Sequence, residues 1–312
     1  MLFWITDYIK NPTIEESVIG AKILSESQKF DAKVLLVWHQ QINSDFIKNF
    51  KDLKGIVRYG VGFDNIDTDL LAKRKIIFCN NPDYGVDEVA DTASAMILNF
   101  VRGINQYNLA AKKIPPSWQE NTNKKIKRLN KVRLGIVGAG RIGSSVIKKL
   151  KSFKFDISFY DPYLPSGYEK VLNVKRTKTL KDLLKDSDVI SLHCPLNLET
   201  TGMINQDFID SCKKGVILVN TARGKLIEST NLLFKNLKNK KIHAIGLDVL
   251  PEEPPIMDDF VDAWKRELFV GRIIINPHSA YYSKESYVEM RKNAAEKALA
   301  ILQNRIPTDI IS

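Results

Sequence analysis

Short apolar runs alternate with amphipathic stretches along the first ninety residues. Four apolar runs, LFWIT, KVLLVW, GIVRYG and KIIFCN, predict buried strands at 2–6, 33–38, 55–60 and 75–80. The stretches between them predict helices at 14–27, 44–52 and 67–75. Because strands and helices take turns, this part of the chain predicts a parallel sheet with helical crossovers.

The same alternation restarts later in the chain. One long helix is predicted at 86–106, and an exposed, polar, proline-containing connection at 112–130. Six further apolar runs then predict strands at 133–138, 156–161, 188–194, 215–220, 242–249 and 272–276. The tail at 286–305 predicts an amphipathic helix that closes the structure. The pattern therefore indicates an α/β protein with two doubly wound units, the second with the stricter strand-helix-strand order.

Length and composition fit a globular protein of two domains. The chain has 312 residues, of which 44% are hydrophobic and 27% charged. No apolar run approaches the roughly 20 residues of a membrane span, and the first residues lack the pattern of a secretion signal. We expect a cytoplasmic protein without membrane contact. Cys79, Cys194 and Cys212 lack any disulfide or zinc spacing, so we expect reduced thiols and no metal site.

The formal net charge of +11 raises the question of a nucleic-acid partner. The lysines are spread along the chain, and the densest basic run, at 124–133, contains no interleaved aromatic residue and no nucleic-acid-binding signature. We interpret this run as a solvated linker and expect no nucleic-acid partner.

A glycine-rich motif follows the strand predicted at 133–138. Gly138, Gly140 and Gly143 have the spacing G-x-G-x-x-G, with Arg141 and Ile142 between the second and third glycines. The first glycine permits a tight turn, the second allows the backbone to approach a pyrophosphate, and the third lets the helix pack on the strand. The helix that follows directs its N-terminus at the anion.

The residue that ends the next predicted strand indicates which dinucleotide binds. Asp161 lies eighteen residues after Gly143, where a carboxylate can bond both hydroxyls of the adenosine ribose. The carboxylate would repel a 2'-phosphate, and the following residues, PYL, supply no arginine to accommodate one. The sequence therefore predicts NAD as the cofactor in preference to NADP.

Three residues that could support hydride transfer lie at the ends of later predicted strands. They are Arg223 in VNTARG, Glu253 in LDVLPEEP and His278 in NPHSA. A carbonyl that accepts hydride needs a proton donor and a fixed cation. Arg223 could hold a carboxylate or carbonyl oxygen, and Glu253 could orient His278 as the acid. Each alone could be an ordinary loop residue; at strand ends beyond a dinucleotide loop, they favour catalysis.

Several segments together resemble the D-isomer-specific 2-hydroxyacid dehydrogenases, over nearly the whole chain. They are YGVGFDNID, LGIVGAGRIG, FYDPY, SLHCPLNLETTGMIN, VNTARG, LDVLPEEP and NPHSA. The resemblance implies a flavodoxin-like substrate domain at 1–95 with 285–312, and an inserted Rossmann NAD-binding domain at 96–284. It also implies a homodimer and catalysis as the domains close. The stretch 255–271 is a longer loop than the family pattern has.

The resemblance also implies roles for individual residues. Arg223, Glu253 and His278 would form the catalytic set. The amides of Val61 and Gly62 would hold the substrate carboxylate. The cofactor would further contact His193, Cys194, Pro195, Thr221, Ala222 and Asp248, the last through the nicotinamide carboxamide. His39 and His243 match no functional position, and we interpret them as structural.

The sequence leaves more than one alternative for the function and for the substrate. The first hypothesis is an NAD-dependent dehydrogenase of a D-2-hydroxy acid, of phosphoglycerate, glycerate or hydroxypyruvate type. The alternative is an NAD(H)-sensing binding protein like the C-terminal-binding corepressors, and a formate dehydrogenase is weaker because formate offers no carbonyl to protonate. Tyr281 and Tyr282, with Tyr59 and Phe63, could form an aromatic wall for the substrate or could serve only packing.

Overall fold

The computed structural model describes residues 2–116, 118–120 and 122–312, which form two compact units. The first unit combines the residues up to Gly85 with Tyr282–Ser312, and the second comprises Val86–Tyr281. The chain therefore leaves the first unit once and returns to it with the C-terminal helix. The sequence-based division was placed at residues 95 and 285, whereas in the structure the whole helix that starts at Val86 lies in the second unit.

A parallel sheet of four strands forms the centre of the first unit, in the order β1-β2-β3-β4. The strands are β1 (Phe3–Ile5), β2 (Val34–Val37), β3 (Gly55–Arg58) and β4 (Ile77–Cys79). Every side chain of β1 and β2 is buried, as expected where helices cover both faces of a parallel sheet. Each strand lies within one of the four apolar runs, so the strand prediction for this unit is confirmed.

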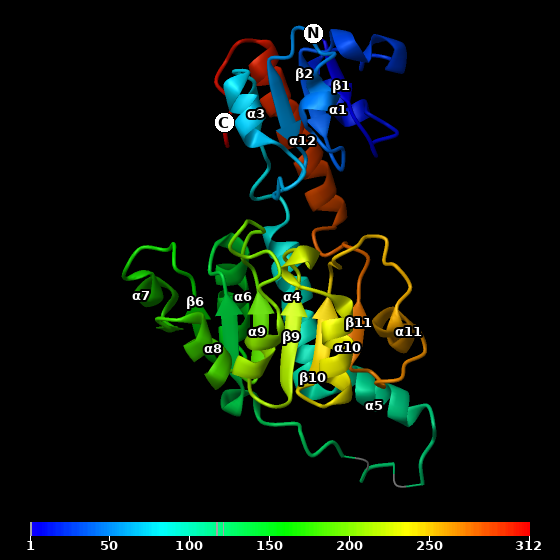
Figure 1. The fold of residues 1–312 in the computed structure, drawn as a ribbon, viewed down its shortest axis with the longest axis vertical. Coiled ribbons are helices and arrows are strands. Elements are labelled where there is room, and N and C mark those ends of the chain that lie inside the picture. Colours follow the sequence, from blue (N-terminus) through cyan, green and yellow to red (C-terminus); the bar gives the residue numbers. More distant parts are fainter. Residues whose placement is uncertain (1, 117, 121) are drawn as a thin grey trace. The chain divides into compact units, whose positions relative to one another are not determined.

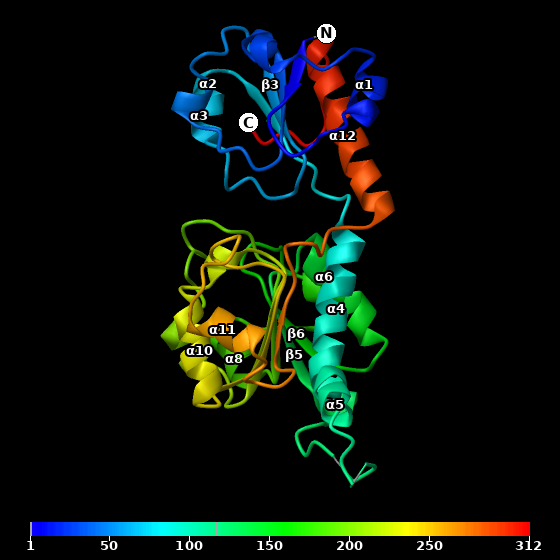
Figure 2. The same cartoon turned by 90° about the vertical axis from the view of Figure 1, so that its right-hand side faces the viewer.

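Helices lie on both faces of this sheet (Figures 1 and 2). α1 (Thr13–Ile19) packs beside α12 (Lys284–Leu302) on one face. α2 (Ser44–Ile47) and α3 (Thr68–Lys73) lie on the other face. A short 3-10 helix, η1 (Glu26–Asp31), precedes β2. The predicted C-terminal helix is therefore part of the first unit and covers its sheet.

The first helix is shorter than the stretch predicted at 14–27. α1 ends at Ile19 because Gly20 adopts a left-handed φ of 69° and donates its N–H back into the helix. The chain then runs along the edge of β1 that faces away from β2, where the Leu24 amide donates to the Phe3 carbonyl oxygen at 3.1 Å. Because the chain visits one side of β1 before it crosses to β2 on the other, the unit is doubly wound.

The second unit contains a parallel sheet of seven strands in the order β11-β10-β9-β8-β5-β6-β7. The strands are β5 (Arg133–Val137), β6 (Asp156–Tyr160), β7 (Lys175–Arg176), β8 (Val189–Leu192), β9 (Val216–Asn220), β10 (Ile242–Leu247) and β11 (Ile273–Ile275). The chain first builds outward from β5 to β7 and then continues from β8 on the other side of β5. This reversal is the switch point of a Rossmann sheet, so the predicted fold class is confirmed.

Two helical layers cover this sheet, with α4 and α6 on one face and α8, α10 and α11 on the other (Figure 2). The helices of the unit are α4 (Val86–Arg102), α5 (Ile104–Ala111), α6 (Arg141–Lys151), α7 (Tyr168–Leu172), α8 (Leu180–Asp186), α9 (Gln206–Ser211), α10 (Thr230–Lys238) and α11 (Asp259–Lys265). Two 3-10 turns, η2 (Leu129–Lys131) and η3 (Gly224–Leu226), complete it.

Two predictions of local structure for this unit are wrong, and one strand was not predicted. The helix predicted at 86–106 is broken at Gly103, whose φ of 66° separates α4 from α5. The loop expected at 255–271 contains α11, which begins because the Asp258 carboxylate accepts a hydrogen bond from the Val261 amide at 2.8 Å. The strand β7 was not predicted, because its two residues are both basic.

No described helix is long and apolar enough to cross a membrane. Within the described part of the chain, no group of three or more histidine, cysteine, aspartate or glutamate side chains is arranged to hold a metal ion. Cys79, Cys194 and Cys212 are free thiols. Burial raises the pKa of Cys194 to about 11 and that of Cys212 to about 12, so these thiols stay protonated at neutral pH.

Candidate active site

The predicted site residues of the second unit all follow the carboxyl ends of its strands. Gly138 follows β5, Asp161 follows β6, His193 follows β8, and the remaining candidates follow β9, β10 and β11. Because all seven strands are parallel, these residues gather at one edge of the sheet, where an open α/β sheet binds its ligands. The glycine motif and His193 follow β5 and β8, the two strands of the switch point.

Two glycines of the motif allow the backbone to pass where no side chain fits. Gly138 has a φ of 85°, and a Cβ placed on it would lie 2.8 Å from the Cys194 nitrogen. A Cβ on Gly143 would lie 2.1 Å from the Gly138 carbonyl oxygen. The first glycine therefore brings the β5 turn against the β8 loop, and the third brings α6 against the β5 turn.

The second glycine of the motif differs from the other two. Gly140 is the residue before α6, and a Cβ built on it would meet no atom within 4 Å. The space beside it is open, in front of a helix of 11 residues whose first amides carry partial positive charge. A pyrophosphate could approach the backbone here, so the loop with Arg141 and Ile142 fits the dinucleotide expected from the sequence.

Asp161 is held by the backbone around it. Its Oδ2 accepts a hydrogen bond from the Ala139 amide at 3.0 Å, and its Oδ1 accepts one from the Tyr163 amide at 3.0 Å. The carboxylate therefore joins the loop after β6 to the glycine motif. Arg176, which the sequence reasoning missed, donates from Nη2 to the Asp161 and Leu164 carbonyl oxygens at 2.6 and 2.8 Å. This guanidinium fixes the loop that carries the carboxylate.

Buried polar atoms at this edge have no partner within the described chain. His193 Nε2 pairs with Ser191 Oγ at 2.9 Å, whereas His193 Nδ1 and Thr221 Oγ1 are shielded and unpaired there. Burial lowers the pKa of His193 to about 3, so the ring is neutral and can accept or donate a hydrogen bond. Unpaired buried polar atoms are costly. They fit the polar groups of a bound cofactor, next to Cys194, Pro195 and Ala222.

Asn220, the last residue of β9, positions Arg223. Its Oδ1 accepts from the Ala222 amide at 3.0 Å, and its Nδ2 donates to the Arg223 carbonyl oxygen at 2.8 Å. The Arg223 guanidinium donates from Nη1 to the Ala222 carbonyl oxygen at 2.7 Å. The sequence reasoning missed Asn220, although a polar residue at the end of the apolar run VILVN was a usable signal.

Gly224 brings the loop after β9 against the loop after β10. A Cβ on Gly224 would lie 1.8 Å from the Leu250 carbonyl oxygen and 2.7 Å from the Pro251 nitrogen, both backbone atoms. Only glycine permits this approach. It places the Arg223 loop beside the segment that carries Glu253.

Glu253 and His278 form a hydrogen-bonded pair, with His278 Nδ1 2.7 Å from Glu253 Oε2. The other carboxylate oxygen, Oε1, accepts from the Leu250 amide at 2.8 Å. Burial tends to raise the pKa of Glu253, but the hydrogen bond and charge of His278, the Leu250 amide and the charge of Arg223 together bring it below its ordinary value. The carboxylate is therefore ionised and can stabilise an imidazolium.

Asp248 shapes the loop that carries His278. It is 2% exposed, and its Oδ1 accepts from the Ser279 and Ala280 amides at 3.0 and 3.1 Å. The His278 amide donates to the Asp248 carbonyl oxygen at 2.8 Å, and His278 has a left-handed φ of 52°. Burial raises the pKa of Asp248, and the two amides oppose this. In the structure Asp248 holds the loop that carries His278 in place, a contact that the sequence did not predict.

The remaining candidates are divided between the units. Val61 and Gly62 follow β3 in the first unit, with Val61 37% exposed and its carbonyl oxygen bonded by Asn80 Nδ2 at 2.6 Å. Tyr281 is half-buried and ends the second unit, directly after Ala280. Val61 and Gly62 belong to the first unit and His278 and Tyr281 to the second, and their meeting at one substrate site stays a prediction.

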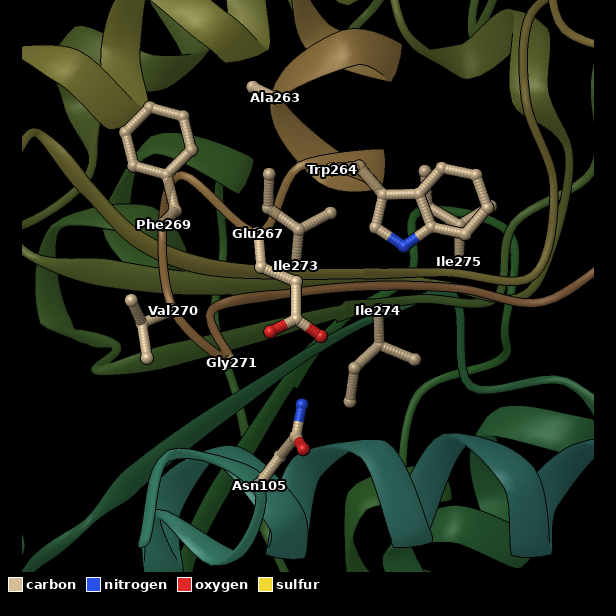
Figure 3. A pocket seen from close by; sticks show the side chains of 10 residues that line it. All are labelled: Asn105, Ala263, Trp264, Glu267, Phe269, Val270, Gly271, Ile273, Ile274 and Ile275. Carbon is tan, nitrogen blue, oxygen red and sulfur yellow. The ribbon is translucent and has the colours of Figure 1, made fainter. Parts of the chain in front are cut away.

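A pocket of about 200 Å³ lies elsewhere on the second unit. It is lined by α11, β11 and the turn between them, with Asn105 from α5; Figure 3 shows Glu267 and Asn105 reaching toward each other between apolar side chains. None of the predicted substrate or cofactor residues is among the described residues that line it.

Comparison with known proteins identifies similar chains. Residues 94–280 match the family model described as D-isomer specific 2-hydroxyacid dehydrogenase, NAD binding domain. The chain is 33% identical over 283 residues to a D-3-phosphoglycerate dehydrogenase of Methanocaldococcus jannaschii, covering 90% of the chain. It is 32% identical over 300 residues to C-terminal-binding protein 1 of Caenorhabditis elegans, covering 94% of the chain. The chain spans 52% and 40% of the lengths of these two relatives.

Among solved structures, the chain is similar to a D-lactate dehydrogenase from Aquifex aeolicus that was complexed with NAD and lactic acid. The TM-score is 0.87 with 28% sequence identity, and the match covers 100% of this chain and 99% of the other.

Proposed function

The chain belongs to the D-isomer specific 2-hydroxyacid dehydrogenase family and carries its NAD-binding domain, and from this premise we propose that it is an NAD-dependent dehydrogenase. It interconverts a 2-oxo acid and the corresponding D-2-hydroxy acid. The observation that carries the proposal is the pair of His278 Nδ1 and Glu253 Oε2 at 2.7 Å, on loops at the ligand-binding edge of the sheet.

The cofactor would be held by the glycine motif and the residues around it. Gly140 and the start of α6 would receive the pyrophosphate, Asp161 the adenosine ribose, and the unpaired atoms of His193 and Thr221 further polar groups of the dinucleotide. When bound, NADH supplies a hydride to the carbonyl carbon of the substrate.

His278 would supply the proton. Its Nδ1 is engaged by Glu253, so the opposite ring nitrogen, Nε2, donates to the substrate oxygen as that oxygen becomes negative. The ionised Glu253 offsets the charge of the imidazolium before the transfer and fixes the plane of the ring. In the oxidation direction, the neutral ring takes the proton back from the hydroxyl group.

Arg223 would bind the substrate as a fixed cation. Its guanidinium can hold the carbonyl oxygen or a carboxylate oxygen, and the Asn220 contacts keep its backbone in place. The amides of Val61 and Gly62 would bind the substrate carboxylate. We also propose that the protein works as a homodimer in the cytoplasm, as expected from the resemblance.

An assay of NADH oxidation with a panel of 2-oxo acids tests the proposal. We expect turnover in the wild type and a loss of about 10²- to 10⁴-fold in kcat in His278→Ala, with NADH binding retained. His243→Ala, which removes a histidine paired with Lys125, is the control and should keep wild-type kcat. NADH binding without turnover on any 2-oxo acid would refute the dehydrogenase and favour the nucleotide-sensing alternative.

A further inference from the structure

Aromatic rings gather at the carboxyl edge of the sheet in the first unit. Trp38, directly after β2, is the centre of the group: its ring centroid lies 4.5 Å from Tyr8, 5.5 Å from Tyr59 and 6.1 Å from Tyr287. Trp38 and Tyr59 are buried, whereas Tyr8 is 58% exposed. The Tyr8 ring therefore covers one part of the buried cluster and presents its other face outward.

The backbone around Tyr8 is constrained to present this ring. Tyr8 has a φ of 67°, and the Ile9 amide donates to the Asp7 carbonyl oxygen at 2.8 Å, which makes Tyr8 the middle residue of a strained γ-turn. The Asp7 carboxylate accepts from the Trp38 and His39 amides at 3.0 and 2.6 Å. It thereby ties the turn after β1 to the turn after β2. Strain maintained by such contacts is typical of functional sites.

Trp38, after β2, lies one strand away from the predicted carboxylate site after β3, and Tyr8, after β1, lies two strands away. Val37 of β2 pairs with Arg58 of β3, and the Tyr59 amide donates to the Val37 carbonyl oxygen at 3.0 Å. Val61 and Gly62 follow within a few residues. Since neighbouring strands are about 4.8 Å apart, the turn after β2 lies about 5 Å and the turn after β1 about 10 Å across the sheet from these amides. A substrate whose carboxylate sits on the amides would therefore need a long side chain to reach Tyr8.

The charges around the rings favour a neutral group over a phosphate. The Arg291 guanidinium beside Tyr287 is buried and bonded to Glu15, with Nε to Oε1 at 2.8 Å and Nη2 to Oε2 at 2.5 Å. Its charge is therefore already neutralised. The Asp7 carboxylate, next to Tyr8 in the chain and bonded to the Trp38 and His39 amides, would repel a phosphate.

We propose that Tyr8, stacked on Trp38, binds the side chain of the substrate, and that this substrate is a 2-oxo acid with an aromatic side chain, an arylpyruvate. The inference rests on the proposed function for its reaction and on the first unit alone for its specificity. The aryl ring stacks on the exposed face of Tyr8.

Binding can be measured without turnover. Phenylpyruvate titrated into the full chain saturated with NAD⁺ cannot react, because both molecules are oxidised, so calorimetry reports affinity alone. We expect phenylpyruvate to bind about tenfold or more tightly than pyruvate, which lacks only the phenyl ring. Tyr8→Ala should weaken phenylpyruvate binding about three- to tenfold and change pyruvate binding by less than about twofold.

Matched variants separate the ring from general damage to the fold. Tyr8→Phe keeps the ring and should retain wild-type affinity for phenylpyruvate. Phe30→Ala removes another partly exposed ring of the first unit and should also leave that affinity unchanged. Equal binding of phenylpyruvate and pyruvate by the wild type, or phenylpyruvate binding that Tyr8→Ala leaves intact, overturns the inference.

Steady-state reduction with NADH distinguishes this inference from the proposed function. If phenylpyruvate binds as described but neither acid is reduced, the dehydrogenase proposal fails and the aromatic binding site stands. If pyruvate or phosphohydroxypyruvate is reduced with a higher kcat/KM than phenylpyruvate, and Tyr8→Ala lowers none of these values selectively, the dehydrogenase stands and the aromatic specificity is refuted.

Discussion

Gly224 should be intolerant of even one added carbon atom. A Cβ at this position would lie 1.8 Å from the Leu250 carbonyl oxygen, where the shortest ordinary contact is 3.4 Å. In Gly224→Ala the loops after β9 and β10 must therefore separate by roughly 1.6 Å, the difference between these distances. Both neighbours are backbone, so no side chain can rotate away.

The separation should lower both stability and activity. Overpacking of this kind costs about 1–3 kcal/mol, which for a domain of this size lowers Tm by about 2–12 °C. The same shift moves Arg223 relative to Glu253, and a misplacement of about 1 Å costs about 10² in rate. We therefore expect kcat to fall about 100-fold.

Thermal unfolding and NADH oxidation measured on the same Gly224→Ala sample test this reasoning. NADH affinity should fall less than kcat, since the glycine motif and Asp161 follow other strands and only Thr221 and Ala222 lie on the displaced β9 loop. A variant with wild-type Tm and kcat would refute the claim that the close backbone packing at Gly224 positions Arg223 relative to Glu253. A lower Tm with unchanged kcat would show that the two loops tolerate the shift.

Three further predictions concern the cofactor, the arginine loop and acid stability. Gly140→Ala fills open space, so Tm should stay within about 2 °C of the wild type while NADH affinity falls about tenfold or more, as measured by calorimetry. Asn220→Ala leaves the Ala222 amide and the Arg223 carbonyl oxygen without their side-chain partner. It should lower the free energy of unfolding by about 1–3 kcal/mol and should also lower kcat. A urea unfolding curve identical to that of the wild type would contradict this. Although burial raises it, the Arg133 amide and the Lys213 ammonium hold the pKa of Asp188 below its ordinary value of 3.8. Its stabilising effect is therefore present above that value and is lost as the pH falls through the lower folded-state pKa. The urea midpoint, measured between about pH 6 and pH 3, should fall less steeply in Asp188→Asn than in the wild type.

The sequence predicted the strands well because parallel strands buried on both faces appear as continuous apolar runs. The ends of helices were harder to predict where a single backbone angle determines them. The helices expected at 14–27 and 86–106 end early at Gly20 and Gly103, whose left-handed φ depends on the chain that follows. The Asp258 cap of α11 could have been recognised from the sequence, but the long segment around it was interpreted as a loop.

The candidate site was predictable where chemistry requires one residue type. An imidazole acid needs a carboxylate partner, so the sequence predicts Glu253 beside His278, and the structure has the two side chains 2.7 Å apart. Asn220, Arg176 and Asp7 were missed because they act through backbone groups of other loops. Such contacts depend on which loops are neighbours, which periodicity does not reveal.

The return of the chain to the first unit has a consequence for synthesis on the ribosome. Residues 86–281 are complete, and their seven-stranded sheet can form, while α12 is still inside the exit tunnel. Until α12 emerges, the Glu15 carboxylate, which is fully buried in the finished unit, lacks Arg291 to neutralise it. The unit that is translated first is thus the last to become stable, and a released chain truncated before residue 291 should expose its N-terminal sheet to proteases while the later unit is already resistant.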